Sequence, residues 1–122
     1  MRPDVEIGSA TIYKICSRES WDDACRLGRY PGSADDRRDG FIHFSARHQL
    51  AATAEKYFKG QADLVLIAVE AARLGTSLRW EPSRGGDLFP HLYKDLETRA
   101  ALSVMPLPLD DQGHPLIPEG LV

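Results

Sequence analysis

The chain is poor in the features that mark several large protein classes. Only two of its 122 residues are cysteines, Cys16 and Cys25, and their spacing fits neither a metal nor a redox motif. We therefore expect free, buried thiols in a reducing cytoplasm. The longest apolar run, Leu64 to Val69, is too short to cross a bilayer, and the first residues lack the apolar segment of a signal peptide. These absences predict a cytoplasmic protein without a membrane segment.

An excess of positive charge is also lacking. The formal net charge is -3 at pH 7, and 27% charged and 43% hydrophobic residues are an ordinary globular balance. Bulk charge of this sign does not attract nucleic acid, so we expect no nucleic-acid partner. We expect instead a small-molecule or nucleotide ligand, and a monomer or homodimer. The length predicts a single domain over residues 1–122, with a leader at 1–9 and an irregular tail at 109–122.

Strand and helix patterns follow one another without regular alternation. The expected strands cover residues 10–16, 39–45, 62–70, 77–81, 88–93 and 98–107. Two main helices are expected, one between Ser17 or Ser20 and Gly28, and one over residues 46–58 that Ser45 would cap. The residues between 29 and 39 read as a loop with solvated charges. This mixture predicts an α+β fold around a strongly bent sheet.

One strand is expected to sit at a sheet edge or to be irregular. Residues 88–93 contain Pro90, which has no N–H to donate to a neighbouring strand. Residues 62–70 are apolar without alternation, which is typical of a central strand buried on both faces. The sequence therefore places residues 62–70 inside a sheet and predicts an edge strand or an irregular segment over residues 88–93.

Polar side chains gather on segments that we expect to face one cleft. Strand alternation puts His43 and Ser45 on one side of the strand over residues 39–45. The same rule puts His91 and Tyr93 on one side of the segment over residues 88–93. Glu81 ends the strand between these two segments. We therefore predict that these three segments converge on one cleft.

Glu81 and three aromatic residues are candidates for contacts with a ligand. Beside Trp80, desolvation would raise the pKa of Glu81 and suit it to act as a base, whereas an ion pair with a neighbouring arginine is the alternative. Tyr30, Trp80 and Tyr93 offer flat surfaces on which a ring can stack. Tyr30 lies next to a Pro-Gly pair, where an aromatic side chain can act as a lid.

Several catalytic motifs are lacking. The Cα atoms of His43 and Ser45 would be roughly 6.6 Å apart, which is unfavourable for a Ser–His couple. There is no Gly-x-Ser-x-Gly elbow and no phosphate-binding glycine motif. His43, His91, Glu81 and Asp87 are suitable metal-ligand types, but without ligand spacing we expect no metal. Purely structural roles for the two histidines stay open.

Two motifs give the chain a resemblance to a known family. These are Gly40-Phe41-Ile42-His43-Phe44-Ser45 and Phe89-Pro90-His91-Leu92-Tyr93, with Leu78-Arg79-Trp80-Glu81 between them. Over about residues 10–108 the chain resembles a small bacterial family of unknown function numbered 952. That family is grouped with ADP-ribosyltransferase-like folds, in which a bent, split, mostly antiparallel sheet holds NAD in a cleft. The resemblance implies this fold and NAD as cofactor.

The resemblance also implies roles for individual residues. In such folds a His or Arg, a Tyr, Ser or His, and a Glu on separate strands hold the dinucleotide, and the Glu engages a ribose hydroxyl. The matching groups here are, as catalytic residues, His43, Glu81 and His91, and as cofactor-binding residues, Tyr30, Ser45, Trp80 and Tyr93. The first hypothesis is an NAD- or ADP-ribose-using transferase or glycohydrolase. The second is a non-catalytic module that binds a small molecule or nucleotide.

Overall fold

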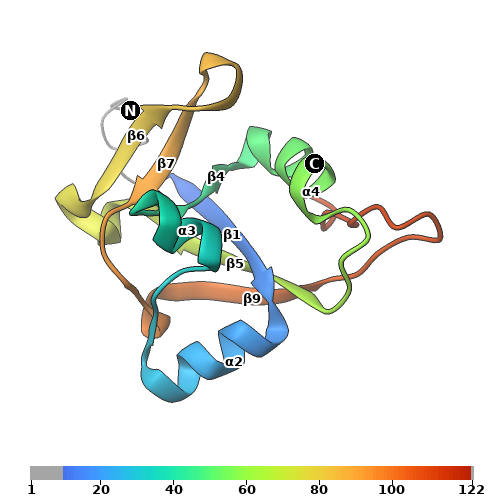
Figure 1. Ribbon diagram of the computed structural model, residues 1–122, viewed down its shortest axis with the longest axis horizontal. Helices are drawn as coiled ribbons and strands as arrows, with labels where there is room; N and C mark the ends of the chain where they lie inside the picture. Colours follow the sequence, from blue (N-terminus) through green and yellow to red (C-terminus); the bar gives the residue numbers. More distant parts are fainter. Residues whose placement is uncertain (1–9, 122) are drawn as a thin grey trace.

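The computed structural model describes residues 10–121, so the expected leader at residues 1–9 lies outside the described part (Figure 1). Its strands are β1 Thr11–Ser17, β2 Arg29–Tyr30, β3 Ile42–His43, β4 Ser45–Ala46, β5 Leu64–Glu70, β6 Leu78–Pro82, β7 Leu88–Leu92, β8 Leu96–Glu97 and β9 Ala101–Leu107. Its α-helices are α2 Arg18–Leu27, α3 Ala34–Asp39 and α4 Leu50–Phe58. Its 3₁₀ helices are η1 Arg47–Gln49, η2 Ala71–Ser77, η3 Arg84–Gly86 and η4 Thr98–Ala100.

The strands form separate sheets in which all pairings are antiparallel. One sheet has the order β4-β1-β5-β9, a second has the order β3-β7-β6, and β2 pairs with β8. In Figure 1 the β6–β7 hairpin projects away from the long strands β1, β5 and β9. The protein is therefore a mixed α+β fold with antiparallel sheets, as predicted. The expected likeness to ADP-ribosyltransferases stays a prediction.

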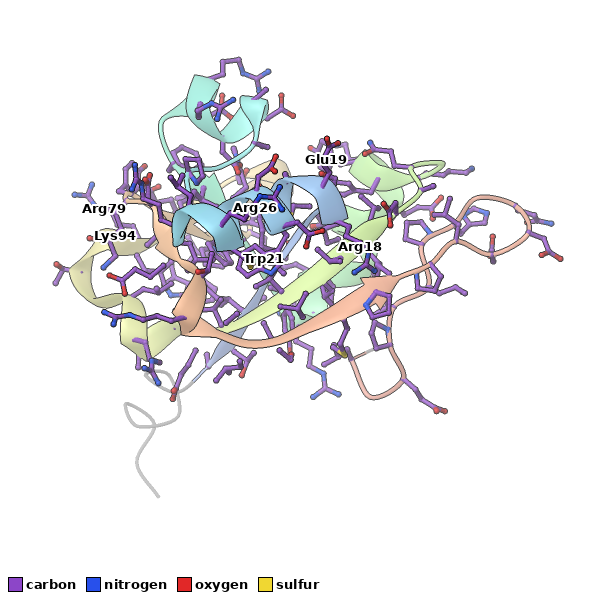
Figure 2. All side chains as sticks on the ribbon, turned by 90° about the horizontal axis from the view of Figure 1, so that it is seen from below. Arg18, Glu19, Trp21, Arg26, Arg79 and Lys94 are labelled. Carbon is purple, nitrogen blue, oxygen red and sulfur yellow. The ribbon has the colours of Figure 1, made fainter. Side chains whose placement is uncertain are left out.

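The larger sheet is covered on both faces, and β5 runs through its interior. Six consecutive residues of β5, Leu64 to Val69, are buried, because alternate side chains enter the cores on opposite faces. Leu50 and Ala54 of α4 pack on one face. On the other face, Trp21 of α2 is 5% exposed and lies between the helix and the strands (Figure 2). The prediction of a central strand over residues 62–70 is confirmed.

The ends of α2 follow from local sequence. The Ser17 side chain accepts a hydrogen bond from the backbone N–H of Ser20 at 3.1 Å, which satisfies one of the free donors of the first turn. Gly28 ends the helix with φ +91, a left-handed conformation that favours glycine. Ser17 rather than Ser20 is therefore the N-cap, and the predicted end is confirmed.

The expected loop between residues 29 and 39 instead contains β2 and α3. Ser33 and Asp36 form a capping box: the Ser33 hydroxyl accepts from the Asp36 N–H, and the Asp36 carboxylate accepts from the Ser33 N–H. Asp36 is only 2% exposed. The prediction of solvated charges is therefore wrong for Asp36, whereas Asp35, Arg37, Arg38 and Asp39 are exposed, and among residues 10–121 there is a third α-helix.

Ser45 does not cap the helix that follows it. Its hydroxyl donates to Thr53 Oγ1 at 3.0 Å, inside the fold. The side-chain oxygen of Gln49 accepts from the Ala46 N–H at 2.9 Å, at the entry to η1 and α4. The predicted cap is wrong because the chain continues beyond Ser45 for several residues before regular α-helix begins at Leu50.

The prediction that Pro90 places its strand at an edge is also wrong, because β7 is the central strand of its sheet. The Pro90 carbonyl accepts from the Phe44 N–H at 3.0 Å. The N and C=O of one residue point to the same side of a strand, so the missing N–H faces Phe44, the residue directly after β3, and not β6. The pairing of β7 with β6 therefore does not use the nitrogen of Pro90.

The cysteines, the C-terminal tail and the helices can each be compared with the sequence predictions. Cys16 is buried as expected, whereas Cys25 is exposed, because it lies on the outer side of α2. The described part of the tail is irregular beyond β9, apart from an isolated bridge between Leu109 and Pro115. Within residues 10–121, none of the helices is both long and apolar enough to cross a bilayer.

Candidate functional site

The strand expected over residues 39–45 divides between two sheets. Tyr13 of β1 pairs with Ser45 of β4 in the larger sheet. Two residues further along this register, Ile15 would face His43. Instead, His43 of β3 pairs with His91 of β7 in the smaller sheet. The two sheets therefore diverge between Ile15 and His43.

This divergence leaves part of β1 with an open edge. Ala71 N–H donates to the Ala10 carbonyl, and Arg18 N–H donates to the Asp63 carbonyl, so the even-numbered residues of this segment turn their main-chain groups toward β5. The odd-numbered residues turn theirs to the other side. There, Ile15 has no strand beside it within residues 10–121, because β4 pairs only with Ile12 and Tyr13. Its N–H and C=O therefore lie along an open strand edge.

A cavity of about 590 Å³ lies at the divergence. Among the residues that line it are four of the predicted site residues, Tyr30, His43, Ser45 and His91. The other three, Trp80, Glu81 and Tyr93, are not among the lining residues. The two histidine-bearing segments thus meet at one cavity, as predicted. The segment with Trp80 and Glu81 does not line it.

His43 and His91 are cross-strand neighbours at the wall of the cavity. Their ring centroids are 5.6 Å apart and their planes are inclined by 72°, an edge-to-face arrangement. Phe41 stacks on His91 with a centroid separation of 4.0 Å. Both imidazoles are therefore held in defined orientations by rings around them.

Asp36 of α3 connects His43 to β1. Its Oδ1 accepts from the His43 backbone N–H at 3.1 Å and contacts His43 Nδ1 at 2.6 Å. Lys14 Nζ lies 2.8 Å from Oδ2 and 3.1 Å from Oδ1, and both side chains are buried. Burial by itself raises the pKa of Asp36, but the hydrogen bond from His43 and the charge of Lys14 outweigh it. The net result is a pKa well below the usual range, so Asp36 is a carboxylate.

The second ring nitrogen of His43 meets another carboxylate. Nε2 lies 3.0 Å from Asp39 Oδ2, at the end of α3. Asp39 also accepts from Arg38, and this hydrogen bond is the main cause of its lowered pKa. Both imidazole nitrogens of His43 thus face acceptors on α3, and both contacts are hydrogen bonds at once only when both nitrogens carry a proton.

Glu81 contacts His91 from outside the cavity. Its Oε1 lies 2.8 Å from His91 Nδ1 and accepts from the Tyr93 hydroxyl at 2.7 Å. The hydrogen bonds from Tyr93 and His91 lower the pKa of Glu81. The expectation that desolvation raises this pKa is wrong, because Glu81 is partly exposed and has two donors. Arg79 is placed over the Tyr93 ring, 4.9 Å from its centroid.

Tyr30 does not present its ring for stacking, and it is not a lid. It is 2% exposed, because the residues around it form β2 rather than a surface loop. Its hydroxyl is buried and lacks a regular hydrogen bond among the described residues, with the Cys16 thiol, a weak partner, beside it. Burial raises the pKa of Tyr30, and burial likewise raises that of the nearby Cys16 thiol, so both stay protonated. A buried, unsatisfied hydroxyl at a cavity wall calls for a partner.

Trp80 lies outside the site. Trp80 pairs with Pro90 across the strands and, by alternation, points to the opposite face from Glu81. It does not line the cavity. In the described part of the chain, no three His, Cys, Asp or Glu side chains are grouped so as to hold a metal ion.

Sequence reasoning missed Lys14, Asp36 and Asp39. Two signals were available. Lys14 is the one charged residue of β1, between apolar neighbours, which is typical of a buried ion pair or of a site. Ser33-x-x-Asp36 has the spacing of a capping box, which marks a helix start rather than a loop. Neither signal indicates that the two residues meet.

These features define a small α+β protein in which two antiparallel sheets diverge around a histidine-lined cavity. The chain belongs to the family described as "Protein of unknown function (DUF952)", whose model matches residues 15–104. A comparison with curated proteins found no match.

Solved structures of one bacterial protein are similar to this chain. The crystal structure of protein CC0527 from Caulobacter crescentus has 52% sequence identity and a TM-score of 0.88, covering 91% of this chain and 97% of that one. A crystal structure of its double mutant has 51% identity and the same TM-score and coverage. The solution NMR structure of CC0527 has 54% identity and a TM-score of 0.79, covering 86% and 90%.

Proposed function

We propose that the protein binds NAD or a related ADP-ribosylated nucleotide in the cavity and cleaves or transfers at the bond between nicotinamide and ribose. The observation that carries this proposal is the divergence of the two sheets between Ile15 and His43. It agrees with the split, bent sheet that the ADP-ribosyltransferase resemblance implies. NAD would supply the activated glycosidic bond, and the chain would bind and orient it.

The open edge of β1 suits a carboxamide. Ile15 offers an N–H donor and a C=O acceptor side by side, without a neighbouring strand in the described part of the chain. A primary amide such as that of nicotinamide presents the complementary acceptor and donor. The buried hydroxyl of Tyr30 adds a neutral polar group at the same cavity wall. These groups fit an uncharged, amide-bearing ring.

His43 is suited to hold the ribose or phosphate part. Asp36 fixes its main chain and its ring, and Asp39 fixes its second nitrogen. Ser45 also lines the cavity, although its hydroxyl already donates to Thr53. A rigidly held imidazole and a short polar side chain provide the orientation that group transfer needs.

A specific observation favours a second candidate, a non-catalytic nucleotide-binding module. The predicted catalytic carboxylate, Glu81, does not line the cavity, and one of its oxygens already meets His91 and Tyr93. Without Glu81 at the ribose, the role that the resemblance gives to the catalytic glutamate is unfilled, and binding would occur without turnover. The two candidates share a cavity and differ in whether nicotinamide is released.

Calorimetric titration with NAD, ADP-ribose and nicotinamide, combined with chromatographic detection of released nicotinamide, tests both candidates. We expect saturable heat from NAD that is weakened at least about tenfold, equivalent to about 1.4 kcal/mol, in His43→Gln. The matched control is His48→Gln, because His48 is exposed and does not line the cavity. Heat without nicotinamide release supports the binding module. No heat from NAD or ADP-ribose at millimolar concentration contradicts both candidates.

A further inference from the structure

We propose that His91 is the general base of this site, that its Nε2 accepts the proton of the attacking nucleophile, and that Glu81 is a positioning residue acting through His91. This inference rests on the proposed function and changes the part played by Glu81. In place of a direct contact with the ribose, Glu81 orients the imidazole that faces the cavity.

The contact between His91 and Glu81 determines which ring nitrogen is the acceptor. A carboxylate only accepts hydrogen bonds, so the 2.8 Å contact requires a proton on His91 Nδ1. In the neutral imidazole, the lone pair is then on Nε2. Glu81 lies outside the cavity and His91 lines it. The nitrogen remote from Glu81 is therefore the one available to a bound molecule.

His43 cannot take this role in the same way. Each of its nitrogens is within 3.0 Å of a carboxylate oxygen, Nδ1 of Asp36 and Nε2 of Asp39. For His91, by contrast, the described residues place a carboxylate only at Nδ1. The two neighbouring histidines thus have different environments, and this separates a binding group from a base.

The surroundings of His91 hold the ring still. His91 is 4% exposed, and Phe41 stacks against it. The Tyr93 hydroxyl donates to the same Glu81 oxygen at 2.7 Å, so this carboxylate is held from two sides. Such a chain of hydrogen bonds fixes both the tautomer and the direction of the imidazole.

The proton transfer can be written with full balance. The nucleophile, water or an alcohol, loses its O–H proton to His91 Nε2. Its oxygen bonds to C1′ of the ribose while the C1′–N bond to nicotinamide breaks. The electron pair of the broken bond neutralises the positive charge of the nicotinamide ring. His91 carries one additional proton, which it later returns to solvent.

The first test is independent of NAD. Nitrogen-15 NMR of the histidine rings reports which nitrogen is protonated. We expect His91 to be the Nδ1–H tautomer in the wild type and to lose this preference in Glu81→Ala. Glu81→Gln retains an acceptor oxygen and should retain the preference in part. Asp87→Asn is the matched control, since Asp87 is a partly exposed carboxylate that pairs with another histidine, His48. A wild-type His91 with the proton on Nε2 overturns the inference.

The second test uses turnover of NAD. We expect His91→Ala to lower kcat by about 100-fold, and Glu81→Ala by about tenfold or more, with little change in KM. Glu81→Gln should lie between Glu81→Ala and the wild type. The acidic limb of the kcat–pH profile should shift in Glu81→Gln, which a merely structural role would not produce. A raised KM for NAD with unchanged kcat in the Glu81 variants would show direct ligand contact and overturn the inference.

The two tests separate the two proposals. If the NMR result holds but NAD neither binds nor reacts, the proposed function fails, whereas the positioning of His91 by Glu81 stands. If NAD reacts but the His91→Ala variant keeps wild-type kcat, the proposed function stands and His91 is not the base.

Discussion

The carboxylate of Asp36 accepts hydrogen bonds from two different atoms of His43, the backbone N–H at 3.1 Å and the ring Nδ1 at 2.6 Å. One side chain thereby holds both the strand and the imidazole that line the cavity. The same carboxylate pairs with Lys14 of β1, so α3 connects the two sheets at the point where they separate.

Replacing Asp36 by asparagine should strongly destabilise the protein. The change leaves the ammonium of Lys14 buried without its counter-charge, a loss that typically costs about 3–5 kcal/mol. Urea unfolding followed by circular dichroism measures this difference. Asp35→Asn is the control on the same helix; its side chain is 73% exposed and should change the free energy of unfolding by less than about 0.5 kcal/mol. Equal stability of the two variants would contradict the buried ion pair.

The stability of the protein should fall on acidification below about pH 4. Asp36 has a lower pKa in the folded protein than the ordinary aspartate value of about 3.9, so the unfolded chain takes up its proton first. Its contribution is complete above the unfolded pKa and decreases as the pH falls toward the folded value. Urea unfolding between pH 7 and pH 3 measures the trend. Carbon-13 NMR of the Asp36 carboxyl group identifies its share, and titration near the ordinary value would contradict the assignment.

Replacing Tyr30 by phenylalanine should leave stability nearly unchanged and weaken ligand binding. Among the described residues the hydroxyl has only a weak thiol neighbour, Cys16, so its removal breaks no regular hydrogen bond there and should change the free energy of unfolding by less than about 1 kcal/mol. If the hydroxyl binds the ligand, the Kd for NAD rises about tenfold. Thermal unfolding and calorimetry on the same variant separate the two effects. A large loss of stability with unchanged affinity would show that the hydroxyl serves the fold.

The two cysteines should differ in reactivity. Cys25 is exposed, whereas Cys16 is 5% exposed and burial raises its pKa, which lowers the fraction of reactive thiolate. With a bulky neutral thiol reagent at pH 7.5, Cys25 should be labelled first, and Cys16 only after addition of denaturant. Mass spectrometry of peptides gives both rates. Labelling at similar rates would show that the cavity opens to reagents at the Cys16 wall.

Local patterns predicted much of the secondary structure. The apolar run of β5, the serine cap of α2 and its glycine end depend on neighbouring residues, and each lies near its expected position. The sequence also predicted that His43 and His91 face one cleft, because strand alternation placed each on the polar side of its segment, and both line one cavity; their pairing across strands was not predicted.

Local patterns did not predict the features that depend on contacts between distant residues. Asp36 belongs to a run of charges that is typical of a solvated surface, and its burial depends on Lys14, which is 22 positions away. Pro90 indicated an edge strand, but β7 is central, and the proline nitrogen lies on the side of β3, at the residue where that strand ends. Glu81 was expected to be desolvated, whereas Tyr93 and His91 supply it with donors.

By itself, the sequence determined the α+β class, the central buried strand and the two histidine-bearing segments, since all of these depend on side-chain periodicity and on residues a few positions apart. Only the tertiary structure decided that the strand around Phe44 divides between two sheets, that Ile15 and His43 line one cavity, and that Asp36 and Lys14 form an ion pair. The physical reason is that strand pairing and the burial of charge depend on partners distant in the chain. No local pattern indicates which residue the partner is.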